Sequence, residues 1–119
     1  MKYLLDTCVL IWALEGDDIK LGKFKELILD TKNNIFISIA SYWEIIIKQT
    51  LGRITVNADL AKAVLDSGFT WLDIKILHLD YIKELPLIHN DPFDRLLVAQ
   101  SKTENLTILT TDSKILQYK

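Results

Sequence analysis

The stretch Tyr3-Leu4-Leu5-Asp6-Thr7 decides the fold that we expect for this chain. Its apolar run ends in a carboxylate and a hydroxyl, and the apolar block Val9-Leu10-Ile11-Trp12-Ala13-Leu14 follows at once. This pattern predicts a buried strand that stops at Asp6 and turns directly into a helix capped by Thr7. The first strand of an open parallel sheet is commonly central, and ligands bind beyond the carboxyl ends of such strands. Asp6 is therefore expected to lie in the middle of a crevice.

The composition indicates a single domain that covers residues 1–119 and closes an apolar core. No window approaches the roughly 20 apolar residues of a membrane span, and the start lacks the layout of a signal peptide. One cysteine, Cys8, cannot form an internal disulfide, which fits a reducing cytoplasm. The formal net charge of −2 argues against a protein that binds nucleic acid chiefly by charge, unless acidic residues hold a cation.

Three further strands are predicted by short β-branched or alternating runs at 35–39, 71–76 and 107–110, with the second of these at an edge. Helical patterns fill the intervals. The expected helices are one at 21–29, one that starts in a capping box from Ser41 to Glu44, one at 58–67 capped by Asn57, a short one at 79–85, one opened by Asp91-Pro92, and one at 113–116. Right-handed crossovers then give a three-layer α/β/α sandwich whose central parallel sheet has four strands in the order 3-2-1-4, with a fifth strand left open.

Four acidic residues have equivalent positions in this fold. Asp6 and Asp112 follow strands, whereas Glu44 and Asp94 lie in the first turns of helices that begin at the same edge of the sheet. Each acid by itself has an ordinary explanation as a helix cap or as a first-turn acid stabilised by the helix dipole. Those explanations do not account for the convergence of all four on one side of the sheet.

Such a convergence predicts a bound cation. Two carboxylates about 4 Å apart repel by roughly 4 kcal/mol at an effective dielectric of about 20, which corresponds to about three pKa units. Oxygen ligands without Cys or His select Mg²⁺ or Mn²⁺ over Zn²⁺. A Mg²⁺ ion held by a few carboxylates suits phosphoryl chemistry, because its remaining positions are open to water and phosphate oxygens.

Several motifs resemble those of the PIN-domain ribonucleases, and among them the VapC-like toxins of toxin–antitoxin pairs. The similarity covers nearly the whole chain. The motifs are Asp6-Thr7 after the first strand, Ser41-x-x-Glu44, the block His89-Asn90-Asp91-Pro92-Phe93-Asp94-Arg95-Leu96-Leu97-Val98-Ala99-Gln100, and Thr110-Thr111-Asp112.

The resemblance implies a Mg²⁺-dependent endoribonuclease, with Mn²⁺ as a substitute, in which a metal-activated water attacks an RNA phosphodiester. Asp6 and Asp94 would be the main metal ligands, and Glu44 and Asp112 would complete the acidic pocket directly or through waters. Thr7 would offer a hydroxyl at the pocket floor. Asp91 would act as a helix cap with a supporting role.

The remaining candidates are weaker. Lys48 and Arg53 could guide the RNA backbone, although solvated surface charge is the default interpretation. Arg95 could bind phosphate, but a structural salt bridge is favoured. His78 and His89 are interpreted as packing or hydrogen-bonding residues. Partners implied by the resemblance are an RNA substrate, a cognate antitoxin that lays a segment in the acidic groove, and a second copy in a homodimer.

Two other functions compete with the ribonuclease. One is a catalytically silent PIN-like module that only binds RNA or a protein. The other is a receiver-like signalling domain, which would need paired acids after the first strand, whereas Asp6 has no acidic neighbour. Cleavage of RNA in the presence of Mg²⁺ would distinguish the toxin from the silent module. Labelling of an Asp by a phosphate donor would support the signalling domain.

Overall fold

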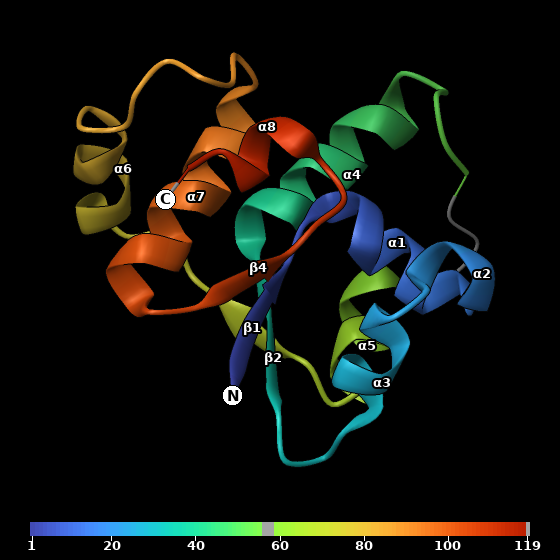
Figure 1. The fold of residues 1–119 in the computed structure, drawn as a ribbon. Helices are drawn as coiled ribbons and strands as arrows, with labels where there is room; N and C mark the ends of the chain where they lie inside the picture. Colours follow the sequence, from blue (N-terminus) through green and yellow to red (C-terminus); the bar gives the residue numbers. More distant parts are fainter. Residues whose placement is uncertain (56–58, 119) are drawn as a thin grey trace.

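Four parallel strands form the middle of the molecule in the order β3-β2-β1-β4, which confirms the predicted topology (Figure 1). The computed structural model describes residues 1–55 and 59–118. The strands are β1 (Lys2–Leu5), β2 (Asn34–Ser38), β3 (Thr70–Leu72) and β4 (Thr107–Leu109). β1 pairs with both β2 and β4, so it is central and its carboxyl end faces a crossover point.

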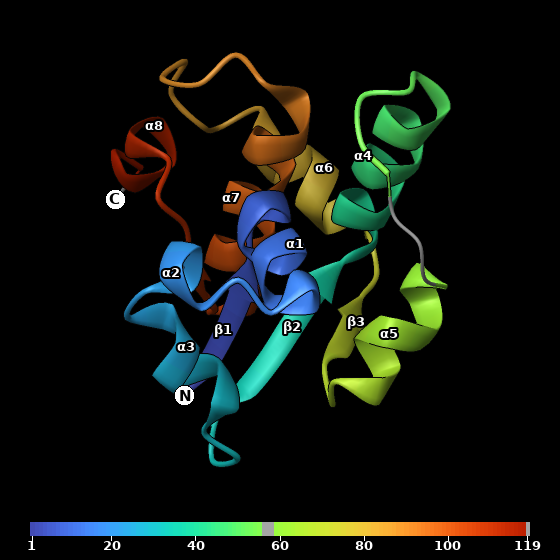
Figure 2. The same ribbon diagram turned by 90° about the vertical axis from the view of Figure 1, so that its right-hand side faces the viewer.

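Helices cover both faces of this sheet, as Figure 2 shows. Tyr3 and Leu5 point to the face covered by α1 (Thr7–Glu15), α2 (Asp18–Leu21), α3 (Phe24–Leu29) and α5 (Leu60–Asp66). Leu4 points to the opposite face and packs with Leu97 of α7 (Pro92–Glu104). α6 (Ile76–Ile82) and α8 (Ser113–Leu116) extend that second layer. The alternation along β1 therefore explains the three layers.

α4 (Ile39–Thr50) starts where β2 ends and contacts both α1 and α7. It therefore lies over the carboxyl edge of the sheet, next to the end of β1 (Figure 1). The predicted capping box from Ser41 to Glu44 is wrong. Ser38 is the N-cap, since its Oγ accepts the N–H of Ala40 at 3.0 Å, and Glu44 lies in the second turn of the helix. At the first helix, similarly, the cap is Asp6 and not Thr7.

Two predicted helices are divided or displaced. The helix expected at 21–29 is broken at Gly22, whose φ of 53° and ψ of −128° suit only glycine. The edge strand expected at 71–76 ends at Leu72, and the next helix starts at Ile76 and not near residue 79. Asn57, the predicted cap at 58–67, lies outside the described residues, and Asp59 caps α5.

The carboxyl-terminal region has no fifth strand within the residues that the structure describes, and the expected helix at 113–116 is α8. α7 begins as predicted, with Asp91 as its N-cap and Pro92 at its first position. It starts at the carboxyl edge of the sheet and runs back across it, which brings Asp94 to the same edge as Asp6. No helix in the described part of the chain has the length and apolar character needed to cross a membrane.

Candidate active site

A pocket of about 330 Å³ opens at the carboxyl edge of the sheet, where β1 ends. Its acidic lining comes from four separate elements and is made up of Asp6, Glu44, Asp91, Asp94 and Asp112. Thr7, Cys8, Trp12, Lys48 and Thr111 complete the lining. The structure thus brings together the four acids that the sequence analysis singled out.

Asp6 lies at the floor of this pocket and is buried. Its Oδ1 accepts the N–H of Val9 at 2.8 Å, which caps α1, and its Oδ2 accepts the hydroxyl of Thr110 at 2.5 Å. Burial raises the pKa of the Asp6 carboxyl, the two hydrogen bonds oppose this, and the nearby Asp112 and Glu44 raise it further. The carboxylate is therefore costly to hold as an anion unless a positive charge is near.

Glu44 reaches the pocket from the second turn of α4 and is held at both oxygens. Its Oε1 accepts the hydroxyl of Thr7 at 2.6 Å, and its Oε2 lies 3.1 Å from Nζ of Lys48, one turn further along α4. Thr7 Oγ1 also lies 3.1 Å from Oγ of Ser41. Thr7 thus lies at the pocket floor, where it fixes Glu44 rather than the start of its own helix.

Asp94 has the most perturbed titration in the pocket, because its pKa is raised to about 7. Burial is the largest cause, the charge of Asp91 is next, and Glu44 and Asp112 add to it, while His89 acts in the opposite direction. The carboxylate form of Asp94 is thus disfavoured, first by burial and then by the negative charge of neighbouring acids. A divalent cation would stabilise this form.

Asp112 stands opposite Asp94, and His89 lies between them. Nε2 of His89 is 3.0 Å from Oδ2 of each carboxylate. Partial burial acts to raise the pKa of Asp112, but hydrogen bonds from His89 and from the N–H groups of Lys114 and Ile115 hold it below its usual value. The pKa values of the two carboxyl groups on either side of His89 are thus shifted in opposite directions, upward for Asp94 and downward for Asp112.

His89 is a site residue that the sequence analysis missed, since it was interpreted as a packing or hydrogen-bonding residue without a part in the site. Its position at the start of the His89–Gln100 block was the available signal. Thr110 was also missed as a partner of Asp6, and here the signal was its position at the end of β4, two residues before Asp112.

The weaker candidates are placed as follows. Asp91 lines the pocket, but its Oδ1 caps α7 by accepting the N–H groups of Phe93 and Asp94. Arg95 does not form the expected salt bridge, since its guanidinium donates to the carbonyls of Ile82 and Pro86. Arg53 is exposed and lies outside the pocket lining.

Cys8 is exposed and lines the acidic pocket. Burial of the thiol raises its pKa, and the negative charge of Asp6 adds to this effect. The thiolate form that would act as a nucleophile or metal ligand is therefore disfavoured. Cys8 is accordingly not counted among the candidate ligands.

The donor set of the pocket fits a hard divalent cation. Asp6, Glu44, Asp94 and Asp112 supply carboxylate oxygens from four elements, and burial together with neighbouring acids raises the pKa values of Asp6 and Asp94. Ligand atoms of His89, Asp94 and Asp112 lie within 4.8 Å of one another. Oxygen-rich sites of this kind suit Mg²⁺ or Mn²⁺.

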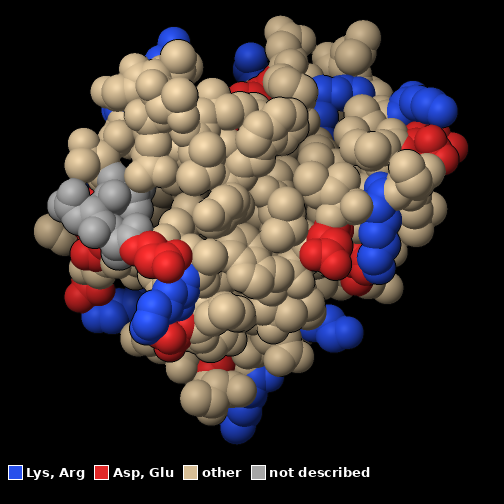
Figure 3. Space-filling model, turned by 180° about the vertical axis from the view of Figure 1, so that it is seen from behind, with Lys and Arg blue, Asp and Glu red and all other residues tan. Residues whose placement is uncertain are grey.

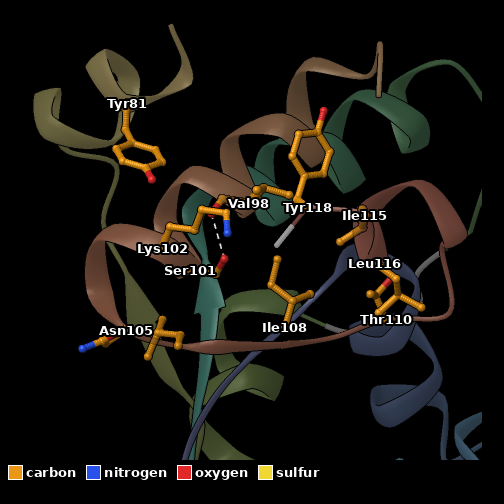
Figure 4. A pocket seen from close by; sticks show the side chains of 11 residues that line it. Tyr81, Val98, Ser101, Lys102, Asn105, Ile108, Thr110, Ile115, Leu116 and Tyr118 are labelled. Carbon is orange, nitrogen blue, oxygen red and sulfur yellow. Dashed lines mark hydrogen bonds between the residues drawn. The ribbon is translucent and has the colours of Figure 1, made fainter. Parts of the chain in front are cut away.

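A second hollow, of about 430 Å³, lies over the outer side of β4 and is shown in Figure 4. Side chains of α6, α7 and α8 line it, among them Tyr81, Ser101, Lys102 and Ile115. No Asp or Glu lines this hollow, so it lacks groups for the chemistry described above. Tyr118 marks one end of the hollow, and in Figure 4 its hydroxyl points away from Ile108 and Thr110.

Comparisons with known proteins agree with this fold. The family model described as PIN domain matches residues 3–119. Among solved structures, the chain is similar to one in the crystal structure of VapBC2 from Rickettsia felis, which is bound to a DNA fragment from its own promoter. The TM-score is 0.71 and the identity 18%, over 99% of this chain and 93% of the other, so this likeness shows a common fold. No curated protein matches the chain.

Proposed function

The chain belongs to the PIN domain family, and we propose that it is a Mg²⁺-dependent endoribonuclease that acts as the toxin of a toxin–antitoxin pair. The observation that carries the proposal is the convergence of Asp6, Glu44, Asp94 and Asp112 in one pocket at the end of the central strand. The whole chain would act as one PIN-like domain, with its RNA substrate in the cytoplasm.

Asp6, Asp94 and Asp112 would hold the metal, and Glu44 would complete the site directly or through waters. Each of these carboxylates is already fixed by a hydrogen bond or ion pair from the protein, so little side-chain entropy is lost when the cation binds. When bound, Mg²⁺ would supply an activated water and would stabilise negative charge on the phosphate. Mn²⁺ is the expected substitute.

The remaining pocket residues would orient the RNA. Lys48 lines the pocket, and its ammonium group beside Glu44 would be within reach of a bound phosphate. Arg53, on the segment that follows α4, would contact the RNA backbone further from the cleaved bond. The guanidinium of Arg95 is already occupied by backbone carbonyls, so we assign it to holding the loop before α7 and not to the RNA.

A cognate antitoxin is the proposed protein partner, since the structural relative is a toxin–antitoxin complex. A segment with a basic side chain would match the charge of the pocket. Trp43, which is 57% exposed, packs edge-on against Phe93 with ring centroids 5.1 Å apart and offers an apolar surface on α4.

A homodimer is the second proposed assembly. Ile39, Trp43 and Ile46 are exposed at helical spacing on α4, and Ile76 and Leu77 are exposed on α6. Figure 3 shows a face of the molecule whose middle carries few charged side chains. Exposed apolar side chains such as those on α4 and α6 indicate a protein–protein contact. Sedimentation of the purified protein would test whether two copies associate.

RNA cleavage by matched variants tests the catalytic proposal. Asp6→Asn keeps a side chain that can cap α1, and Asp94→Asn keeps the volume, so both should fold. Each should lower Mg²⁺-dependent cleavage of RNA by at least roughly 100-fold, the upper end of the loss seen for residues that only support metal ligands. Asp66→Asn, which removes an exposed acid of α5 that pairs with Lys62, serves as the control.

Full cleavage by Asp94→Asn, or binding of RNA without cleavage by the unaltered protein in Mg²⁺ and in Mn²⁺, would overturn the enzymatic proposal. The second result would support the silent RNA-binding module. Sequencing of the new ends in total RNA after induction would identify the substrate class.

A further inference from the structure

His89 occupies a position that allows two opposite roles. Its Nε2 lies 3.0 Å from Oδ2 of Asp94 and 3.0 Å from Oδ2 of Asp112, and its side chain is only 13% exposed. A ring nitrogen at such a place is either a metal ligand or a hydrogen-bond donor to the ligands. The first role needs a bare lone pair on Nε2, whereas the second needs a proton there.

The backbone decides between these roles. The N–H of Asp91 donates to Nδ1 of His89 at 3.1 Å. A nitrogen that accepts a hydrogen bond carries no proton, so the proton of the neutral ring is on Nε2. Coordination through Nε2 would require that proton to move to Nδ1, where it would face the N–H of Asp91. A backbone N–H cannot turn into an acceptor, so this tautomer would lose a hydrogen bond inside the pocket wall.

The backbone at His89 is held as well. The backbone N–H of His89 donates to the hydroxyl of Tyr118 at 2.8 Å, and Nη1 of Arg95 lies 3.2 Å from the same hydroxyl. Arg95 in turn donates to the carbonyls of Ile82 and Pro86. These contacts fix where the ring is attached, and the contacts at Nδ1 and Nε2 fix how the ring is turned.

We propose that His89 is a positioning residue, which donates its Nε2–H to Asp112, lies 3.0 Å from Oδ2 of Asp94, and orients both carboxylates from outside the coordination sphere of the metal. The proposal rests on the proposed function in so far as it takes these two carboxylates as metal ligands. A donor between them reduces their mutual repulsion and leaves their other lone pairs available. The coordination sphere then stays entirely oxygen, which favours Mg²⁺ over Zn²⁺.

The tautomer is the first quantity to measure. In protein labelled with ¹⁵N at histidine, the ring nitrogen shifts identify which nitrogen carries the proton. We expect the Nε2–H form in the metal-free protein and in the Mg²⁺-loaded protein. With Mn²⁺ bound, electron spin-echo measurements should show no directly coordinated nitrogen. An Nδ1–H form after loading, or a direct nitrogen coupling to Mn²⁺, would overturn the proposal.

Variants separate a donor from a ligand. Gln in place of His89 can present an amide N–H close to the position of Nε2 but is a poor metal ligand, whereas Ala presents nothing. By calorimetry without RNA, His89→Gln should bind Mg²⁺ with nearly the affinity of the unaltered protein, and His89→Ala should bind about tenfold more weakly. Equal losses in the two variants would contradict the donor role.

These measurements also keep the two proposals apart. If the unaltered protein binds no divalent cation, the proposed function fails, while the tautomer of the metal-free protein still decides whether His89 donates to Asp94 and Asp112. If His89→Ala does not fold, His89→Gln and the tautomer measurement on the unaltered protein remain decisive. Tyr118→Phe, which removes only the hydroxyl that accepts the His89 N–H, should weaken Mg²⁺ binding less than His89→Ala.

Discussion

The hydroxyl of Thr110 lies 2.5 Å from Oδ2 of Asp6, although the two are 104 positions apart in the sequence. The same hydroxyl accepts the N–H of Asp112 at 2.9 Å. A hydroxyl has one proton, so it donates to the carboxylate and accepts from the amide. This arrangement requires β4 to pair beside β1, and it ties Asp6 to the loop that carries Asp112. The side chain of Thr110 thus fixes the positions of two proposed metal ligands, Asp6 and Asp112.

Replacement of Thr110 tests this link. Thr110→Val keeps the shape but leaves the buried Asp6 without its donor, so we expect the free energy of unfolding at pH 7 to fall by about 1.5–3 kcal/mol. Thr110→Ser keeps the hydroxyl and should lose clearly less. Denaturant titrations of both variants provide the measurement. Equal losses would mean that the methyl group, and not the hydroxyl, matters at this position.

The pH dependence of stability should reveal the raised pKa of Asp94. Its pKa of about 7 in the folded protein lies above the value near 3.9 of an unfolded Asp, so the folded state binds more protons between these values. In the metal-free protein, the contribution of Asp94 to the free energy of unfolding should therefore be fully present below about pH 4 and be lost as the pH rises through 7. The raised pKa of Asp6 acts in the same direction.

The matched variant is Asp94→Asn, which cannot titrate. Its stability should fall less between pH 5 and 8 than that of the unaltered protein, by at most about 2.7 kcal/mol, because about two of the three pKa units lie within this range. Saturating Mg²⁺ should restore the stability of the unaltered protein at pH 8, because the cation binds the deprotonated carboxylates. If the free energy of unfolding of Asp94→Asn falls with pH as steeply as that of the unaltered protein, Asp94 does not cause the pH dependence.

The sheet order and the convergence of the acids were predictable from the sequence. Both follow from properties visible along the chain, namely the apolar strand that ends at Asp6, the alternation of strands with helices, and the handedness of crossovers. The acidic positions then follow from the rule that parallel strands end at one edge. None of these steps requires knowledge of a side-chain conformation.

The parts that were missed depend on three-dimensional distances or on competition between local signals. Ser38 and Ser41 are both able to cap α4, and the point where β2 stops pairing with β3 selects the first. Gly22 breaks a helix because its backbone adopts a positive φ, which a hydrophobic pattern does not report. His89 meets Asp112 only after the chain between them has folded.

The cap of α5 provides a test of one corrected boundary. Oδ1 of Asp59 accepts the N–H of Lys62 at 3.2 Å, whereas the sequence suggested Asn57 as the cap. Asp59→Ala should lower the free energy of unfolding by about 1 kcal/mol, and Asp59→Asn should be nearly neutral because Asn caps equally well. Cleavage of RNA should be unaffected in both variants, since α5 does not line the acidic pocket. Equal losses in the two variants would argue against a capping role.

Lys48 allows a test of RNA contact that is separate from stability. It lines the pocket and pairs with Glu44 at 3.1 Å, and Lys62 forms an i,i+4 pair in the reverse order with Asp66 on α5, away from the pocket. An exposed pair of this spacing, such as Lys62–Asp66, contributes only about 0.3–0.5 kcal/mol, whereas Glu44 is buried, so Lys48→Gln should be destabilised more than Lys62→Gln. A lysine that contacts a phosphate releases a counterion when RNA binds. Lys48→Gln should therefore lower the slope of log affinity against log salt by about 0.7 for single-stranded RNA.

Binding is best measured in the Asp94→Asn background, where the RNA should stay intact. Lys62→Gln should leave both the affinity and the salt slope unchanged. If the two lysine variants give the same slope, Lys48 serves only to hold Glu44, and its ion pair would be structural. If only Lys48→Gln lowers this slope, so that it weakens RNA binding most at low salt, Lys48 guides the backbone of the substrate into the acidic pocket.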